Sequence, residues 1–278
     1  MNSSEFLTSS PLAATFNGND LLSELPVESG HLTIMPVSVI DIMAQGKRQN
    51  ENHGSTSSRA NYSPFPSEIA TLCYEFYLRD ATFVFDPFAG WGERAAAAKQ
   101  NDVAYTGFDS SQEAIDKALA DYGVTNKHAD SRFERIPAFD GLITCPPYWN
   151  LEKYADPRGL DREKTWAGFV EMLAHVFRRC YESATNGTNF CIMVGDWRKD
   201  HYYYDLEWQV STMFKNFGAQ TVDKVVVSRS KVSKIKIMLP QAKRLGYSVR
   251  VHENLLVFKK PNGQRPPQGA QSGDGSHD

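Results

Sequence analysis

Segments typical of β-strands alternate with segments typical of α-helices along the middle of this 278-residue chain. Helical periodicity covers residues 67–78, 93–99, 112–122 and 165–184, and the apolar, strand-like runs that alternate with them cover 82–85, 103–108, 139–144 and 189–194. This alternation predicts an α/β protein with a doubly wound, mostly parallel sheet that has helices on both faces. In such sheets, ligands bind beyond the carboxyl ends of the strands.

Acidic residues and a proline turn stand at the carboxyl ends of the predicted strands. Asp86 and Asp109 end two strands, Asp130 follows a short third strand, and a Cys-Pro-Pro-Tyr turn at 145–148 follows a fourth. Because parallel strands end at the same edge of a sheet, these residues should meet along one rim. We therefore expect the functional site at this rim.

The stretch from Asp86 to Gly92 reads Asp-Pro-Phe-Ala-Gly-Trp-Gly and links a strand to a helix. Its two glycines let the backbone turn tightly and approach a ligand closely. The exposed N–H groups at the start of the helix favour an anion or a carboxylate. A tight strand–helix turn without a ligand fits the same residues.

The two aspartates further along the rim each allow two interpretations. Asp109 is placed to accept hydrogen bonds from ribose hydroxyls, or it caps the next helix in competition with Ser110 and Ser111. Asp130 could accept a hydrogen bond from an adenine amino group, or it is a surface-loop residue. The sequence contains no phosphate-binding loop with Lys and Ser or Thr, which argues against nucleoside triphosphates.

The turn formed by Thr144-Cys-Pro-Pro-Tyr148 offers hydrogen-bond acceptors and an aromatic ring. Two consecutive prolines fix the backbone and provide no N–H donors, while their carbonyl groups remain available as acceptors. The neighbouring tyrosine offers a flat face. Together these groups suit a planar ring that carries an amino group, and a base buried in a duplex would first have to be flipped out. A Pro-Pro loop with a packed tyrosine is the alternative.

The formal net charge of −3 gives the whole chain no tendency to bind nucleic acid, but its basic residues are unevenly distributed. Residues 224–260 contain ten Lys or Arg and one acidic residue, Glu253. Within them, residues 228–247 interrupt an expected hairpin at the sheet edge, and phosphate contacts dominate nucleic-acid affinity. This basic insertion is the candidate DNA contact, and a solvated loop is the alternative; its candidate residues are Lys231, Lys234, Lys236, Lys243 and Arg244.

The remaining composition narrows the class of protein. No long apolar run predicts a membrane span, and the first residues lack the pattern of a signal peptide. The four cysteines do not have metal-ligand spacing, so we expect no metal and a reduced, cytoplasmic protein. We expect an N-terminal extension with a mobile basic loop at 1–60, a catalytic domain at 61–260 and a disordered tail at 261–278.

Four blocks in this order resemble the amino-methyltransferases of DNA, which make N4-methylcytosine and N6-methyladenine. The blocks are Tyr62-Ser-Pro-Phe-Pro-Ser-Glu-Ile69, Asp86-Pro-Phe-Ala-Gly90, Thr144-Cys-Pro-Pro-Tyr148 and His252-Glu-Asn-Leu-Leu-Val-Phe-Lys-Lys260, and the resemblance covers about residues 60 to 260. It implies a Rossmann-like class I methyltransferase fold with a seven-stranded sheet, S-adenosylmethionine as the cofactor, and duplex DNA with a flipped base as the substrate. The implied setting is DNA modification, as in restriction–modification systems.

The resemblance also implies roles for single residues. Phe65 and Pro66 would wall the methionine end of the cofactor. The loop would form the floor of its site, through Asp86, Phe88, Ala89, Gly90 and Gly92. Asp109 would hold the ribose and Asp130 the adenine. In the catalytic turn of Cys145, Pro146, Pro147 and Tyr148, the carbonyl of Pro146 would accept from the target amine and Tyr148 would stack on the base.

Two departures from the family pattern bear on the reaction. The cofactor loop continues Trp91-Gly92-Glu93 where the family has Ser-Gly-Thr, and Cys145 stands where the family has Asp, Asn or Ser. A cysteine matches serine best in size, and serine is typical of cytosine enzymes, which favours N4 of cytosine over N6 of adenine. Because Cys145 precedes the prolines, we do not expect it to act as a nucleophile.

Other functions remain open. An RNA base methyltransferase shares the fold and the Pro-Pro turn, and a catalytically inactive nucleic-acid-binding module would account for Trp91 and Cys145. A protein-directed methyltransferase is a more distant alternative. No separate target-recognition domain is evident, so a specificity partner or a homodimer would fit the chain.

Overall fold

The computed structural model describes residues 37–42, 65–150, 159–199, 201–229 and 235–263. The chain divides into the units Met1–His31 and Leu32–Asp278, and all described residues belong to the second unit. Among the helices of these residues, none is both long enough and apolar enough to cross a membrane.

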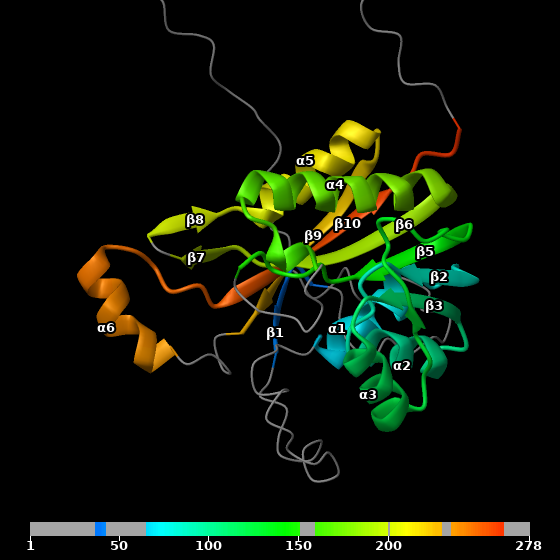
Figure 1. Ribbon diagram of the computed structural model, residues 1–278, viewed down its shortest axis with the longest axis horizontal. Helices are drawn as coiled ribbons and strands as arrows, with labels where there is room; N and C mark the ends of the chain where they lie inside the picture. The colour runs from blue at the N-terminus through cyan, green and yellow to red at the C-terminus, as the bar shows by residue number, and fades with distance from the viewer. Residues whose placement is uncertain (1–36, 43–64, 151–158, 200, 230–234, 264–278) are drawn as a thin grey trace, which may run out of the picture. The chain divides into compact units, whose positions relative to one another are not determined.

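The second unit is built around an eight-stranded sheet with the strand order β4–β3–β2–β5–β6–β10–β9–β1 (Figure 1). Neighbouring strands pair in parallel, except that β10 is antiparallel to both β6 and β9. The strands are β1 (Val39–Asp41), β2 (Phe83–Asp86), β3 (Ala104–Asp109), β4 (Lys127–His128), β5 (Phe139–Thr144), β6 (Ala184–Val194), β9 (Gln220–Ser228) and β10 (His252–Lys259). The predicted doubly wound, mostly parallel sheet is therefore confirmed.

Helices cover both faces of this sheet (Figure 1). They are α1 (Ser67–Leu72), which continues into the π-helix η3 (Cys73–Tyr77), then α2 (Glu93–Gln100), α3 (Gln112–Tyr122), the 3-10 helix η4 (Leu160–Arg162), α4 (Trp166–Ser183), α5 (Leu206–Phe217) and α6 (Ile235–Leu245). Helices α4 and α5 pack on one face, and α1 and α2 pack on the other.

Alternation along the central strands explains why two cores form. Successive side chains of a strand point to opposite faces. On β6, Phe190 and Ile192 therefore join the core under α4 and α5, while Cys191 and Met193 join the core under α1. A strand that is apolar on both faces must be covered on both faces, as parallel strands usually are.

Several local expectations are corrected by the structure. The helix predicted at 67–78 widens into a π-helix at Cys73, where Asn189 Nδ2 donates to the carbonyl oxygen of Tyr77 at 2.7 Å. A short antiparallel ribbon formed by β7 (Trp197–Lys199) and β8 (Tyr202–Tyr204) was not predicted. The predicted basic insertion contains helix α6, which includes Pro240.

The sheet has one strand more than the predicted seven because residues assigned to an N-terminal extension contribute to it. Strand β1 lies within the predicted extension at 1–60 and pairs in parallel with the outer edge of β9. The rest of that extension, the mobile loop predicted within it, and residues 264–278 of the predicted tail lie outside the described residues.

Gly107 of β3 lies where the loop after β2 packs against the sheet. A Cβ atom at this position would lie 2.6 Å from Cβ of Ala89, 2.7 Å from Oδ1 of Asn126 and 2.7 Å from the hydroxyl of Tyr105. Such distances are too short for a side chain, so this position requires glycine. The close approach brings the loop against the end of β3.

We expect Gly107→Ala to lower the free energy of unfolding by about 1–3 kcal/mol, because overpacking forces the loop and the sheet apart. Urea denaturation followed by circular dichroism measures this change. Ala104→Ser on the same strand is the control, since Ala104 is exposed. Equal stability of Gly107→Ala and the wild type would contradict the packing described here.

Candidate functional site

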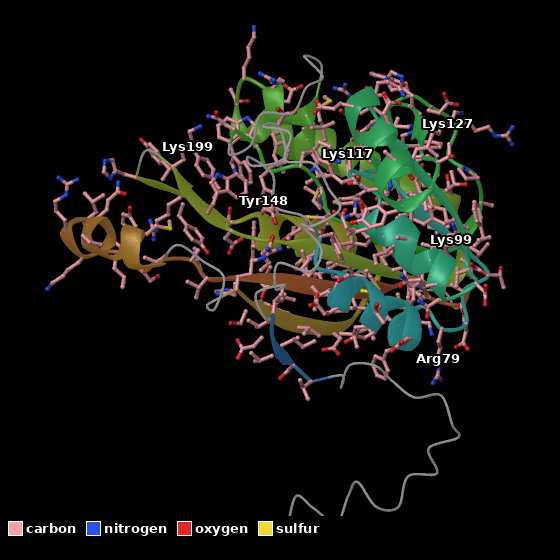
Figure 2. All side chains as sticks on the ribbon, turned by 90° about the horizontal axis from the view of Figure 1, so that it is seen from below. Arg79, Lys99, Lys117, Lys127, Tyr148 and Lys199 are labelled. Carbon is pink, nitrogen blue, oxygen red and sulfur yellow. The ribbon has the colours of Figure 1, made fainter. Side chains whose placement is uncertain are left out.

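One pocket lies at the carboxyl ends of the parallel strands. Its lining includes Asp109 at the end of β3, Asp130 beyond β4, the turn Cys145–Tyr148 after β5, Phe65 before α1 and Glu253 on β10. Figure 2 shows Tyr148 in the middle of the molecule, between the helices and the β7–β8 ribbon. The rim expected from the strand ends is therefore present.

Asp86, at the end of β2, lies fully buried beneath this pocket. Its carboxylate accepts hydrogen bonds from the Nε of Arg94 at 2.6 Å, the hydroxyl of Thr144 at 2.6 Å, the hydroxyl of Tyr105 at 3.0 Å and the backbone N–H of Phe88 at 3.0 Å. These donors come from helix α2, strand β5, strand β3 and the loop. Asp86 thus joins the parts of the rim to one another.

Arg94, in the first turn of α2, is the cation that balances Asp86. Its guanidinium also donates to the carbonyl oxygen of Phe88 at 2.6 Å and lies over the ring of Phe65, 4.8 Å from the ring centroid. Burial alone would lower the pKa of Arg94, but the charge of Asp86, the hydrogen bond to it and smaller contributions from Tyr105 and Cys145 together raise the pKa above its ordinary value. Arg94 is therefore charged, and it fixes both the loop and the wall of the pocket.

The glycines of the loop have separate structural roles. Gly90 has a φ of +56°, lines the pocket and donates its N–H to Asp109. Gly92 has a φ of +96°, and a Cβ there would lie 2.7 Å from Cβ of Ala118, so Gly92 lets α2 pack closely on α3. Ala89 is fully buried and donates to the carbonyl oxygen of Phe108 at 2.9 Å.

Asp109 is held by two backbone donors. The N–H of Gly90 donates to Oδ2 at 2.7 Å, and the N–H of Ser111 donates to Oδ1 at 2.8 Å. The side chain of Ser111 caps α3 by accepting from the N–H of Ala114, so Asp109 does not serve as the cap. Burial raises the pKa of Asp109, although the two N–H groups act in the opposite direction.

Asp130 lines the pocket in an ion pair with Arg132. Arg132 donates to it from Nη2 at 2.7 Å and from Nε at 3.0 Å, and the backbone N–H of Arg132 donates at 2.9 Å. The next residue, Ser131, donates its hydroxyl to the carbonyl oxygen of Pro87 at 2.8 Å. The loop after β4 is therefore tied to the loop after β2.

The turn at Cys145–Tyr148 carries a rigidly held tyrosine. The hydroxyl of Tyr148 donates to Oε1 of Glu253 at 2.7 Å, and Oε2 of Glu253 accepts from the Nε of Arg229. The ring of Tyr148 meets the ring of Trp197 edge-on, with centroids 5.5 Å apart. Burial and the charge of Glu253 raise the pKa of Tyr148 well above its ordinary value, so its hydroxyl stays protonated as a donor.

The thiol of Cys145 is half-buried and lines the same pocket. Its Sγ lies 4.0 Å from the carbonyl oxygen of Pro146, a distance that allows a weak S–H donor contact. Behind Tyr148, the rings of Trp149, Trp166, Trp197 and Tyr204 contact one another at centroid distances of 5.2 to 5.9 Å. This aromatic cluster gives the turn a stiff support.

The structure brings together most of the residues that the sequence singled out. Phe65, Phe88, Gly90, Asp109, Asp130, Cys145, Pro146, Pro147 and Tyr148 line the pocket. Pro66, Asp86, Ala89 and Gly92, all in the described part of the chain, lie outside its lining. Pro66 is instead the N-cap residue directly before helix α1, and its carbonyl oxygen accepts from the N–H groups of Ile69 and Ala70.

Arg94, Arg229 and Glu253 also line the pocket, but the sequence did not identify them as site residues. Glu253 carried one signal, since it is the single acid in a strongly basic stretch. Of the predicted DNA-contacting residues, Lys231 and Lys234 lie outside the described residues, and the side chain of Lys236 is not described either. Lys243 and Arg244 are exposed in the last turn of α6.

No model of a known protein family matches this sequence. A comparison with curated proteins also finds no significant relative.

Solved structures with a similar fold do exist. The [4+2]-cyclase SpnF matches with a TM-score of 0.50 and 16% identity, over 71% of this chain and 82% of that one. TrmN from Thermus thermophilus matches with a TM-score of 0.47 and 16% identity over 73% of this chain. This chain spans about half, 52%, of the length of TrmN. The 1,6-didemethyltoxoflavin-N1-methyltransferase of Burkholderia thailandensis matches with a TM-score of 0.47 and 14% identity, over 70% and 78% of the two chains. Together with the strand order, the likeness to SpnF concerns the fold alone, which is a doubly wound, Rossmann-like α/β fold.

We expect Arg94→Gln to lower the free energy of unfolding by about 3–5 kcal/mol, because Asp86 would be left buried without its cation. Urea denaturation measures the loss. Lys99→Gln removes one charge from the exposed side of the same helix and serves as the control. If the two variants were equally stable, the pair of Asp86 and Arg94 would not hold the rim together.

Proposed function

We propose that this chain is a methyltransferase that uses S-adenosylmethionine to methylate the exocyclic amino group of a flipped DNA base. The observation that carries the proposal is the pairing of two groups in one pocket. The carboxylate of Asp109, held by two N–H groups, faces the same space as the Cys145–Tyr148 turn. We also propose residues 61–260 as the catalytic domain.

The half of the pocket near β2 and β3 fits a nucleoside with a charged amino-acid tail. Each oxygen of Asp109 accepts one backbone N–H and retains a lone pair for a ribose hydroxyl. Phe65 and Phe88 supply apolar walls, and Gly90 allows close approach of the backbone. Asp130 would accept from the adenine amine beside its ion pair with Arg132. S-adenosylmethionine bound there would supply an electrophilic methyl group on a sulfonium centre.

The half of the pocket near β5 and β10 fits a planar base. Tyr148 is fixed at its hydroxyl by Glu253 and at its ring by Trp197, so it offers a rigid surface for stacking. The carbonyl oxygen of Pro146 would accept a hydrogen bond from the target amine. That contact keeps the nitrogen lone pair aimed at the methyl donor, and correct orientation of reactants accounts for a large part of enzymatic rate enhancement.

One feature favours N4 of cytosine as the target. Cys145 stands at the position where cytosine-specific members of the resembling family have serine, and cysteine is close to serine in size.

The direct test supplies methyl-labelled S-adenosylmethionine and unmodified duplex DNA, followed by digestion and mass spectrometry of the nucleosides. We expect N4-methylcytosine from the wild type. Tyr148→Ala should abolish transfer because the stacking surface is lost. Tyr148→Phe is the matched variant, which keeps the ring and loses the bond to Glu253, and it should retain measurable transfer.

Each other outcome identifies an alternative. Label in N6-methyladenine would overturn the preference for cytosine and keep the reaction. Label in RNA and not in DNA would establish an RNA methyltransferase. Binding of the cofactor with no transfer to DNA, RNA or protein would establish an inactive binding module.

Cofactor binding can be tested without turnover, by titration calorimetry with S-adenosylhomocysteine. We expect Asp109→Ala to weaken binding by about 1.5–3 kcal/mol, as expected for the loss of hydrogen bonds to a charged acceptor. Asp80→Asn is the control, because the side chain of Asp80 is 91% exposed and Asp80 precedes β2, whose other end lies at the pocket. If Asp109→Ala bound S-adenosylhomocysteine with unchanged affinity, Asp109 would not be a ribose-binding residue.

The titration of Asp109 adds a pH dependence to this binding. Burial raises the pKa of Asp109, and the ionised carboxylate is the better acceptor for ribose hydroxyls. The affinity for S-adenosylhomocysteine should therefore reach its full value at pH values above the raised pKa of Asp109. It should fall as the pH decreases through this pKa, at a higher pH than for an ordinary aspartate. The same calorimetric titration over a pH series measures this, and Asp109→Ala should lose the dependence.

A further inference from the structure

Helix α6 (Ile235–Leu245) lies away from the helices that cover the main sheet (Figure 1). Among its described side chains, Ala242 is buried. Most of the others are exposed, namely those of Met238, Leu239, Pro240, Gln241, Lys243 and Arg244. None of the α6 side chains that the structure describes belongs to a hydrophobic core. The proposed reaction does not use this helix.

A helix with these properties requires a partner surface. Helix α6 has 11 residues and contains Pro240, and isolated helices shorter than about 12–15 residues are marginal in water. Met238 and Leu239 are large apolar residues that are 48% and 51% exposed. Because most helical stability in proteins comes from the packing of one face, we expect α6 to pack against another molecule.

The charges on and around α6 indicate that this molecule is anionic. The helix contains no acidic residue, and its last turn carries Lys243 and Arg244. The single acid among residues 224–260 is Glu253, which already accepts hydrogen bonds from Tyr148 and Arg229. Phosphate groups are therefore complementary to this part of the chain.

The residues after α6 attach the helix to the β7–β8 ribbon. Gly246 follows the helix with a φ of +72°, which turns the chain. Tyr247 then lies against Arg198 of β7, with 5.1 Å between the guanidinium and the ring centroid. The guanidinium of Arg250 lies 4.6 Å from the ring centroid of Tyr203 of β8. Because Arg198 and Tyr203 are directly across from each other, both contacts are on one face of the ribbon.

The other face of the ribbon contacts the base half of the pocket. Trp197 and Tyr204 are directly across from each other on this face, and their rings stack with centroids 5.4 Å apart. The ring of Trp197 meets the ring of Tyr148 at 5.5 Å. The ribbon therefore connects α6 to the residue on which the target base would stack.

We propose that α6 enters the major groove of the target duplex beside the flipped base and reads the sequence there. This inference rests on the proposed function, in which a duplex with one flipped base lies at Tyr148. The major groove is about 12 Å wide and admits an α-helix, and at about 1.5 Å per residue α6 is about 16 Å long. Lys243 and Arg244 contact phosphates, and the amide of Gln241 contacts a base edge, since it both donates and accepts.

The two kinds of contact predict different changes in binding. Each phosphate contact to a DNA duplex contributes about 0.9 to the slope of log affinity against log salt. The double variant Lys243→Gln/Arg244→Gln should therefore reduce this slope by about 1.8 and weaken binding to all sequences alike. Gln241→Ala should leave the slope unchanged and reduce the preference for one base pair beside the target by about 5- to 150-fold.

The experiment measures fluorescence anisotropy of a labelled DNA duplex with the full chain, over about 50 to 200 mM salt. Sequencing of the bound fraction of a random-sequence duplex library measures the base preference. Duplex RNA is titrated in parallel, because its deep, narrow major groove does not admit a helix, and so are phosphatidylserine vesicles. Arg79→Gln/Lys99→Gln is the matched control for charge, since both residues are exposed and lie on the side of Tyr148 away from α6 (Figure 2). Gln100→Ala, at an exposed position of α2, is the control for Gln241→Ala.

Each outcome decides the proposal. The substituted residues are exposed, so the variants should fold, which circular dichroism verifies. An unchanged slope in the Lys243/Arg244 variant, or an unchanged base preference in Gln241→Ala, would overturn the proposed contacts. Equal affinity for duplex RNA, or tighter binding to the vesicles, would overturn the proposed occupant. Duplex binding that depends on α6 without methyl transfer would refute the proposed function and leave this inference in place.

Discussion

The buried ion pair of Asp86 and Arg94 is the interaction on which the rest of the site depends. A buried carboxylate needs a cation and further hydrogen bonds, and Asp86 receives them from α2, β3, β5 and the loop that follows its own strand. Because Thr144 directly precedes the Cys145–Tyr148 turn, the same carboxylate fixes the start of that turn. Arg94 then extends the network to the carbonyl of Phe88 and the ring of Phe65. The pair therefore sets the relative positions of the two halves of the pocket, although Asp86 itself does not line it.

A second network performs the same task from the opposite side of the pocket. Glu253 on β10 joins Tyr148, which follows β5, to Arg229, which follows β9. Strand β10 is the antiparallel strand between β6 and β9, so its start lies at the rim where the parallel strands end. The reversal of one strand thus places an acid among the carboxyl ends of its neighbours. Glu253 thus holds the hydroxyl of Tyr148, while the edge-on contact with Trp197 holds its ring.

Those parts of the site that depend on strand ends could be predicted from the sequence, and those that depend on distant pairings could not. The apolar, strand-like runs and the residues after them located Asp109, Asp130 and the 145–148 turn, since parallel strands must end at one rim. The sequence left open whether Asp109 or Ser111 caps α3, because both residue types are common caps, and only the hydrogen bond from Ala114 decides it. Arg94 and Glu253 were missed because their partners lie 8 and 105 residues away. The three-residue strands of the ribbon were missed because runs this short carry no periodic signal.

The loop after β2 shows why a motif and the pocket beside it need not coincide. Glycines are expected in such loops because a ligand approaches the backbone, and Gly90 is placed accordingly. Gly92 is instead required by the 2.7 Å approach of Ala118, and Gly107 by the approach of Ala89. The departure from the family pattern at Trp91-Gly92-Glu93 therefore keeps the glycine that helix packing demands and changes the residues on either side of it. Trp91 and Glu93 both line the pocket, so the departure alters the surface that a ligand meets while the backbone of the turn is retained.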